Sequence, residues 1–380
     1  MNFKSLMLGA AAAAAATGAQ AADLPVAPEP VDYVRVCDAY GARFYYIPGT
    51  ETCLRVGGRV RVQYTANNFG DNGDWDDRSA NDTSFFARGY LYLDSRTNTE
   101  FGLLRTFTEI YGTNTNGGES FSLGSAYIQW GGLTFGHVTS FFDYFTGQAF
   151  MGVVGRNWSD NTSNVLAYTA AFGNGFSATL SLEDGSLREV GSYAGHKIPD
   201  LVANLRVDQG WGSAQVMGAL HNVRPAVAAN DGAVGWAIGG GVIIDLPMLA
   251  SGSNIAFQAQ YADGALAYIG AATGATAAYN GVSIYDAAAN GDTSTGYSLS
   301  GGVYHQATST VGLALDGSYM SIDLGNSTVD VTRWAIDGSV SWTPVSGLAL
   351  GVDMGYANTD VDGAGDQDEI LAGFRVQRTF

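Results

Sequence analysis

Several stretches of this sequence alternate apolar and polar residues with a period of two, and this pattern restricts the fold more than any other feature. Near the C-terminus, Phe374 and Val376 alternate with Gly373, Arg375 and Gln377. Successive side chains of a β-strand point to opposite sides of a sheet, so such a stretch predicts a strand with one apolar and one polar face. The same alternation recurs in residues 313–319, 333–342 and 348–356.

The first residues resemble an export signal and are set aside from the fold. Lys4 precedes an apolar run at residues 6–16, and Ala19-Gln20-Ala21 places small residues where a signal peptidase reads them. We therefore expect residues 1–21 to be a signal peptide. The alternative is an N-terminal membrane anchor, but the run is too short to span about 30 Å of hydrocarbon.

Composition suggests how the exported chain could meet a membrane. Only 14% of its residues are charged, against about 25% in soluble domains. The longest apolar candidate after the signal, residues 233–244, stops at Asp245, short of the ~20 residues of a transmembrane helix. Such a chain would cross a membrane as strands. The formal charge of −18 argues against nucleic-acid partners, which need basic surfaces.

The strands of a soluble β-sandwich would also alternate polar and apolar residues. The lengths of the connections between strands distinguish a membrane barrel from such a sandwich. Short turns at 131–132, 173–175 and 210–212 alternate with connections at about 66–83, 140–163, 185–198, 223–232 and 264–296. Acidic residues cluster between expected strands, at 71–77 and at 360–369. Outer-membrane barrels combine short periplasmic turns with long external loops. The first acidic cluster could bind divalent cations near lipopolysaccharide or be a solvated loop.

The fold class predicted is all-β, a transmembrane antiparallel β-barrel of about 16 strands over residues 53–380, preceded by a periplasmic segment at 22–52. A barrel this wide leaves an aqueous passage unless something plugs it. The expected strands are 53–65, 84–95, 100–112, 122–130, 133–139, 164–172, 176–184, 199–208, 213–222, 234–245, 254–263, 297–306, 310–320, 330–342, 348–357 and 368–380.

Motifs at both ends and in the middle of the chain resemble one family. Residues 33–41 (YVRVCDAYG) and 44–56 (FYYIPGTETCLRV) are similar to the mature N-terminus of the alphaproteobacterial general porins of the Brucella and rhizobial type, and 141–143, 173–178 and 374–380 also match. The resemblance implies a homotrimeric outer-membrane barrel of sixteen strands, whose third external loop folds inward. It implies passive diffusion of small hydrophilic solutes and ions, with outer-membrane lipid and lipopolysaccharide around the barrel. The terminal Phe380 resembles the signal read by the barrel-assembly machinery.

The two cysteines fit an exported protein. Cys37 and Cys53 are the only cysteines, and the periplasm is oxidising, so we expect a disulfide that could contribute ~3 kcal/mol. The alternative is two free structural thiols. A metal or redox role lacks the supporting histidine ligands, and no cofactor is expected.

Candidate pore residues follow from the polar faces of the first strands. Parity places Arg59 and Arg61 on the face opposite the apolar residues, and Arg88 on the equivalent face of the next strand. Arg105 is a further candidate, although its strand has apolar residues on the same parity. The loop expected to fold inward, about 140–163, carries Asp143, Arg156 and Asp160. The resemblance implies that wall arginines face loop carboxylates across the narrowest point of the pore.

Two other classes of barrel protein remain as alternatives. An enzyme needs a nucleophile and a base held together, whereas the four histidines at 137, 196, 221 and 305 are scattered. A non-conducting adhesin or structural barrel would have a plugged interior, and the long connection at 264–296 leaves room for this. No aromatic motif typical of a sugar slide is recognisable, so the sequence names no preferred solute.

Overall fold

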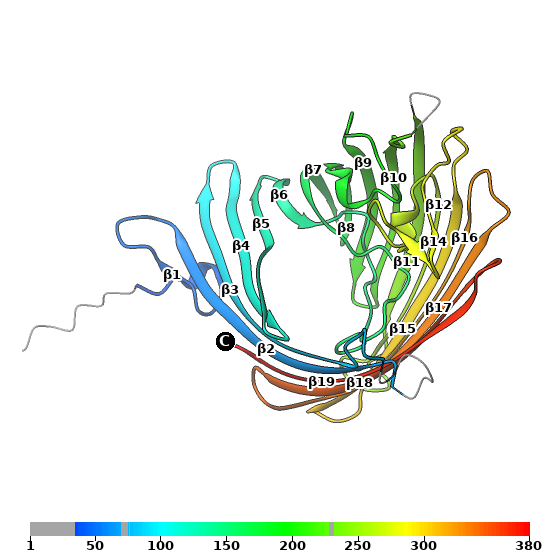
Figure 1. The fold of residues 1–380 in the computed structure, drawn as a ribbon. Coiled ribbons are helices and arrows are strands. Elements are labelled where there is room, and N and C mark those ends of the chain that lie inside the picture. The colour runs from blue at the N-terminus through cyan, green and yellow to red at the C-terminus, as the bar shows by residue number, and fades with distance from the viewer. Residues whose placement is uncertain (1–34, 70–74, 76, 228–231) are drawn as a thin grey trace, which may run out of the picture.

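The computed structural model describes residues 35–69, 75, 77–227 and 232–380, and its wall is a closed antiparallel β-barrel. The main sheet has seventeen strands, one of which is the short β1 (Tyr45–Tyr46), so sixteen strands form the wall. The last strand pairs with the first long one, which closes the ring (Figure 1). The prediction of an all-β barrel of about sixteen strands is confirmed.

The wall strands follow one another around the barrel in chain order, each antiparallel to its neighbours. They are β2 (Cys53–Asn67), β3 (Thr83–Thr99), β4 (Gly102–Thr115), β5 (Gly118–Trp130), β6 (Leu133–Thr139), β7 (Thr162–Gly173), β8 (Phe176–Glu183), β9 (Asp200–Gln209), β10 (Gly212–Val223), β11 (Ala233–Asp245), β12 (Asn254–Asp263), β15 (Thr295–Gln306), β16 (Val311–Asp323), β17 (Asp330–Val345), β18 (Leu348–Val361) and β19 (Gly365–Thr379).

Two connections are tighter than the sequence predicted. β4 and β5 extend to a turn of only Asn116 and Gly117, with φ of 49° and 87°, the left-handed geometry that two-residue hairpins require. The acidic cluster at 360–369 was expected between strands, but β18 and β19 leave only residues 362–364 outside them. Both connections are short because the strands remain paired beyond the residues in which polar and apolar side chains alternate. Asp71, Asp74 and Asp76 of the other cluster lie outside the described residues.

The two faces of the wall differ as the alternation requires. Large apolar side chains such as Leu205, Val216 and Leu299 are more than half exposed on the outer surface, whereas Gln215 and Ser300 point inward and are buried. Three short 3-10 helices are described: η1 (Asp38–Tyr40), η2 (Gly185–Leu187) and η3 (Leu266–Ile269). Among the described residues, no helix is long and apolar enough to cross a membrane.

A packed core sits inside the long-loop end of the barrel. Its central residues include Tyr268 and Ile269 of η3, with Phe142 from the segment after β6 and Met217 from β10. The two-stranded sheet of β13 (Ala278–Tyr279) and β14 (Val282–Ser283) belongs to the same connection between β12 and β15 as η3. The long connections therefore pack against one another rather than project freely.

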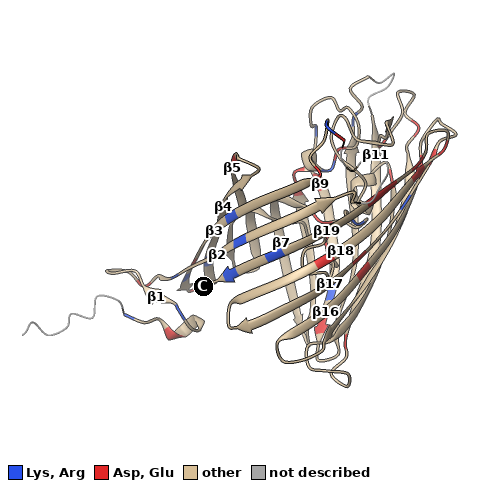
Figure 2. Ribbon diagram, turned by 60° about the horizontal axis from the view of Figure 1, so that its bottom comes forward, with Lys and Arg blue, Asp and Glu red and all other residues tan. Residues whose placement is uncertain are grey.

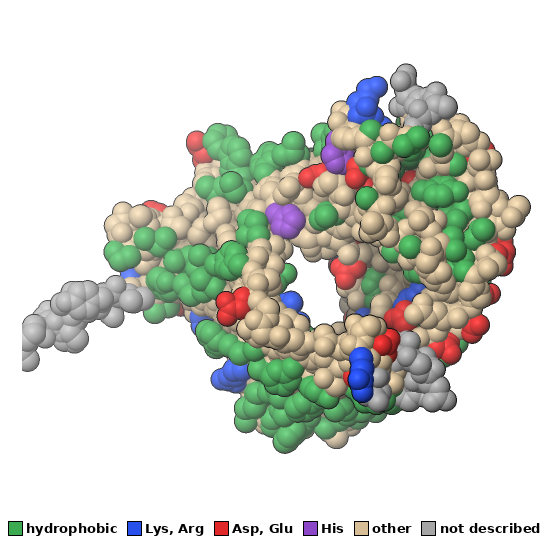
Figure 3. Space-filling model, in the orientation of Figure 1, with side chains coloured by type: hydrophobic (Ala, Val, Ile, Leu, Met, Phe, Trp, Pro, Cys, Tyr) green, Lys and Arg blue, Asp and Glu red, His purple; other side chains and the backbone are tan. Residues whose placement is uncertain are grey.

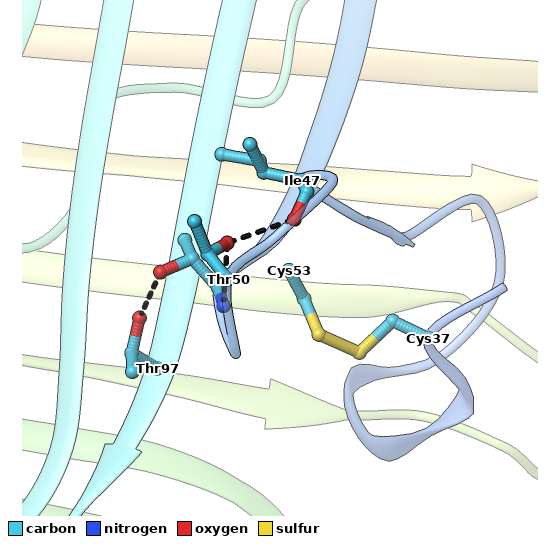
Figure 4. Close-up of a disulfide and its surroundings, with 6 residues drawn as sticks. Cys37, Ile47, Thr50, Cys53 and Thr97 are labelled. Carbon is cyan, nitrogen blue, oxygen red and sulfur yellow. Dashed lines mark hydrogen bonds between the residues drawn. A yellow bond between two sulfur atoms is a disulfide. The ribbon is translucent and has the colours of Figure 1, made fainter. Parts of the chain in front are cut away.

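The N-terminal described segment is fastened to the wall by the predicted disulfide. Cys37 is bonded to Cys53, with 6.0 Å between the two Cα atoms (Figure 4). The Thr50 hydroxyl donates to the Ile47 carbonyl at 2.9 Å in the turn between them. Both cysteines are at most 1% exposed and pack against Phe44. The alternative of two free thiols is therefore wrong in this structure.

The C-terminal residue lies at the seam that closes the barrel. The Phe380 N–H donates to the Gly58 carbonyl at 3.0 Å, and the Gly58 N–H donates back to Phe380 at 3.1 Å. A side chain at Gly58 would meet the Phe380 ring, so glycine makes room for it. The aromatic terminus thus packs onto the first wall strand.

Candidate pore constriction

The connection between β6 and β7, residues 140–161, leaves the wall and contacts strands on the opposite side of the ring. The backbone N–H groups of Gln148 and Ala149 both donate to Asp316 of β16, at 2.7 Å each. Met151 and Gly152 donate to Asp353 of β18 at 2.6 and 3.0 Å. Because β16 and β18 stand about half a turn of the barrel away from β6 and β7, this segment crosses the interior.

Other wall side chains accept backbone N–H groups from the same segment, which we call the constriction loop. The Val154 N–H donates to Asp337 of β17 at 3.2 Å. Four neutral acceptors do the same: Gln258 for Phe145, Gln260 for Ser159, Ser318 for Asn157 and Ser339 for Phe150, at 2.9–3.2 Å. Buried backbone N–H groups need such partners, so the polar inner face of these strands satisfies an irregular loop.

Arg156 neutralises two carboxylates of the wall from within the constriction loop. Asp316 and Asp337 are directly opposite one another on paired strands, an arrangement that is destabilising for like charges. The Arg156 guanidinium lies 3.4 Å from Asp316 and 3.8 Å from Asp337. Both carboxylates are at most 1% exposed. Negative charge on this wall is therefore covered by the loop.

Asp143 and Asp160, the two predicted loop carboxylates, occupy different environments. Asp143 accepts from the Asn161 N–H at 2.5 Å, contacts Arg188 at 3.1 Å and accepts a short hydrogen bond from Ser159. Its side chain is 1% exposed, so it joins the two ends of the loop. Asp160 is exposed. The surrounding loop nevertheless limits the hydration of this carboxylate, and this effect and the neighbouring charge of Asp143 raise the pKa of Asp160.

Arg59, Arg61 and Arg88 lie together on the inner faces of β2 and β3, around the ring of Tyr90. Their guanidinium carbons are 4.0, 5.7 and 5.8 Å from the Tyr90 ring centroid. Arg61 and Arg88 are directly opposite in the β2–β3 register. Among the described residues, no carboxylate lies within 4.0 Å of these three cations. We call them the arginine wall.

Arg105 belongs to a different cluster, nearer the end of the barrel with short turns. It lies 3.1 Å from Asp94, which also contacts Arg96 at 2.9 Å and Arg55 at 3.3 Å. The Asp94 carboxylate is 1% exposed and forms ion pairs with all three guanidinium groups. Arg105 is on the inner face, as proposed from the sequence, but it is paired rather than free.

Several residues of this region were not recognised in the sequence. Asp316, Asp337 and Asp353 are on predicted strands, but nothing local indicates that a loop lies against them. Arg375 of β19 donates to Gln63 at 2.5 and 2.8 Å and to the Phe150 carbonyl at 2.7 Å. Its place on the polar face of the last strand was the only available signal.

An open passage remains between the constriction loop and the arginine wall. The space-filling view shows a hole through the molecule with acidic and basic side chains on its rim (Figure 3). In the ribbon view, basic residues mark the strands β2 and β3, while acidic residues mark the strands β16 to β18 (Figure 2). A closed barrel, apolar outside and polar inside, with an unblocked lumen is a membrane channel.

Comparisons with known proteins define the family of this channel. Residues 23–377 match the family model described as the porin subfamily, so the chain belongs to that family. Porin Omp2b of Brucella suis biovar 1 is 45% identical over 249 residues, which cover 59% of this chain and 67% of that protein. The resemblance to Brucella-type porins is thereby confirmed.

Two solved structures share the fold. The outer membrane channel DcaP of Acinetobacter baumannii has a TM-score of 0.71 at 17% identity and covers 88% of this chain and 99% of its own. OmpT of Vibrio cholerae in its trimer form has a TM-score of 0.56 at 9% identity, covering 87% and 100%. The protein is an outer-membrane porin, whose water-filled barrel admits small hydrophilic solutes and ions by passive diffusion.

Proposed function

We propose that the constriction loop and the arginine wall together form the selective part of this porin. The observation that carries the proposal is the asymmetry of charge. Within the part of the chain that the structure describes, no carboxylate lies within 4.0 Å of Arg59, Arg61 or Arg88, whereas Asp316 and Asp337 are paired with Arg156. Unbalanced positive charge on one side of the passage, with neutralised carboxylates on the other, creates a transverse field. Such a field orients dipolar solutes and disfavours bulky apolar ones that cannot replace ordered water.

Reversal potentials test this assignment. In planar bilayers with a KCl gradient, Arg59→Gln, Arg61→Gln and Arg88→Gln combined should shift the reversal potential toward cation preference. The matched control is Arg224→Gln, because Arg224 donates to the Gly195 carbonyl in the external loops and carries the same charge away from the passage. Equal reversal potentials for the triple variant and the native porin would remove the arginine wall from the selectivity argument.

The assembled state is proposed to be a homotrimer in the outer membrane. The trimer form of the related OmpT fold supports this assembly, and the apolar outer belt suits contact with membrane lipid and lipopolysaccharide. Light scattering of the purified protein in detergent measures the assembly. A monomer mass under conditions in which conductance is retained would contradict the trimer.

The proposal also covers the N-terminal segments of the chain and the passive nature of the channel. Residues 1–21 are proposed to be removed on export, and residues 22–52 to lie on the periplasmic side, where the short turns are. Mass spectrometry of the mature protein tests the cleavage site. The channel is proposed to work without catalysis, metal or cofactor, as a passive pore of the family requires.

A further inference from the structure

Aromatic side chains form a continuous ladder on the inner face of β3, β4 and β5. The order is Tyr111, Tyr90, Tyr92, Phe107 and Tyr127, with successive ring centroids 5.1, 6.1, 6.4 and 5.4 Å apart. Tyr92 and Phe107 are nearly parallel, at 18°. Because β4 begins at Gly102 next to a short turn, the ladder descends from the arginine wall toward the periplasmic end.

Guanidinium groups accompany this ladder along its length. Arg59 lies 4.0 Å from the Tyr90 centroid and Arg88 lies 4.6 Å from that of Tyr111. Lower down, Arg105 lies 5.5 Å from Phe107 and 5.6 Å from Tyr127. These distances are within the range in which cations are attracted to ring faces. Guanidinium groups therefore lie against both ends of the ladder, whereas Glu109 stands opposite Tyr92 in its middle.

Two guanidinium atoms of the arginine wall are buried without a protein partner in the part of the chain that the structure describes. Within the described residues, the Nε atoms of Arg59 and Arg61 have no hydrogen-bond partner. Each buried donor without a partner is costly, and a packing role alone would not retain several like charges around one ring. An anion beside these three like charges would offset their mutual repulsion.

We propose that this ladder is a binding track for organic anions that carry a ring. The carboxylate or phosphate of such a solute meets the guanidinium groups of Arg59, Arg61 and Arg88, while its ring stacks on the aromatic side chains. An anion without a ring makes only the first contact, and a neutral ring makes only the second. The inference rests on the proposed function, because the solute must first enter a conducting pore.

The test compares matched solutes on the assembled porin in planar bilayers. Benzoate and acetate carry the same carboxylate, and benzyl alcohol carries the same ring without charge. Benzoate should reduce the KCl current at a concentration about five- to tenfold lower than acetate or benzyl alcohol, which corresponds to one ring contact added to the ion pair. Equal half-blocking concentrations for benzoate and acetate would overturn the track.

Variants of the ladder test where the discrimination arises. Tyr92→Leu combined with Phe107→Leu keeps apolar side chains but removes two rings, and should bring benzoate to within about twofold of acetate. The control is Tyr304→Leu on β15, a lumen tyrosine that donates to Gln306 at 2.9 Å and is not part of the ladder. This variant should keep the native discrimination.

The KCl conductance separates failure of this inference from failure of the proposed function. A porin that conducts but binds benzoate no better than acetate retains its channel function and lacks the track. A porin with no conductance at all contradicts the channel itself. Native discrimination persisting in the double variant would move the binding of ring-bearing anions away from Tyr92 and Phe107.

Discussion

The two walls of the passage have the same alternation of polar and apolar residues, but their inward polar side chains have different roles. On β2 and β3, the inward parity carries half-buried arginines around Tyr90, for which the described residues supply no carboxylate partner. On β16 to β18, the inward parity carries aspartates that are buried and bonded to the constriction loop. Polar side chains on the inner face can therefore either line the passage or bind the loop, and the path of the loop determines which.

The largest effect is expected from removing the carboxylates that anchor the loop. Asp316→Ala combined with Asp353→Ala deletes the acceptors of four backbone N–H groups, and each hydrogen bond to a charged group contributes about 1.5–3 kcal/mol. The loop should detach from the wall and the pore should widen. Liposome swelling should show faster entry of larger sugars.

The control for this variant is Asp323→Ala, at the exposed end of the same strand β16. It should leave the swelling rates unchanged. Native rates for large sugars in the double variant would mean that other contacts hold the loop, and the contrast between the two walls would lose its main support.

Removing Arg156 should have the next largest effect. Arg156→Gln leaves the opposed carboxylates of Asp316 and Asp337 without their shared cation, and breaking a buried ion pair costs about 3–5 kcal/mol. The thermal melting temperature should fall. Arg206→Gln is the matched control, because its pair with Asp208 is 39% and 53% exposed and should contribute at most about 1 kcal/mol. Equal melting of the two variants would contradict a special role for Arg156.

A smaller effect should come from filling space under the loop. A side chain added at Gly351 of β18 would collide with the Phe150 ring, whereas nothing lies within 4 Å of the same position at Gly89 of β3. Gly351→Ala should therefore loosen the loop and lower the melting temperature, since overpacking costs about 1–3 kcal/mol. Gly89→Ala should not. Indistinguishable melting curves would show that the position under the loop accepts a side chain as easily as a position on the outer face of β3.

The smallest effect should be a dependence of selectivity on pH. The pKa of Asp160 is raised, so this exposed carboxylate takes up its proton at a higher pH than an ordinary aspartate does. Between pH 7 and pH 4 the passage should lose negative charge on the loop side, and the selectivity should shift toward anions. Reversal potentials across this range measure the change. Asp160→Asn should reduce the change of reversal potential with pH. An unaltered pH response in this variant would show that another group titrates.

The sequence determined the properties that depend on neighbouring residues along the chain. Parity placed Arg59, Arg61 and Arg88 on the inner face, and alternation predicted sixteen strands at nearly their observed positions. It underestimated strand length at Asn116-Gly117, because strand pairing outlasts the apolar pattern. It also left two readings of the cysteine pair, between which the observed bond decided.

Only the tertiary structure decided which polar residues meet across the barrel. Asp143 was proposed to face the arginines, yet it is buried against Arg188, while Asp316, Asp337 and Asp353 receive the loop. The rings of the aromatic ladder likewise come from three strands, so no local sequence motif predicts the ladder. Periodicity is a local property that fixes which face a side chain occupies. The contacts of Gln148 with Asp316 and of Met151 with Asp353 join residues 168 and 202 positions apart. They depend on barrel closure and on the course of one loop, which a period of two does not encode.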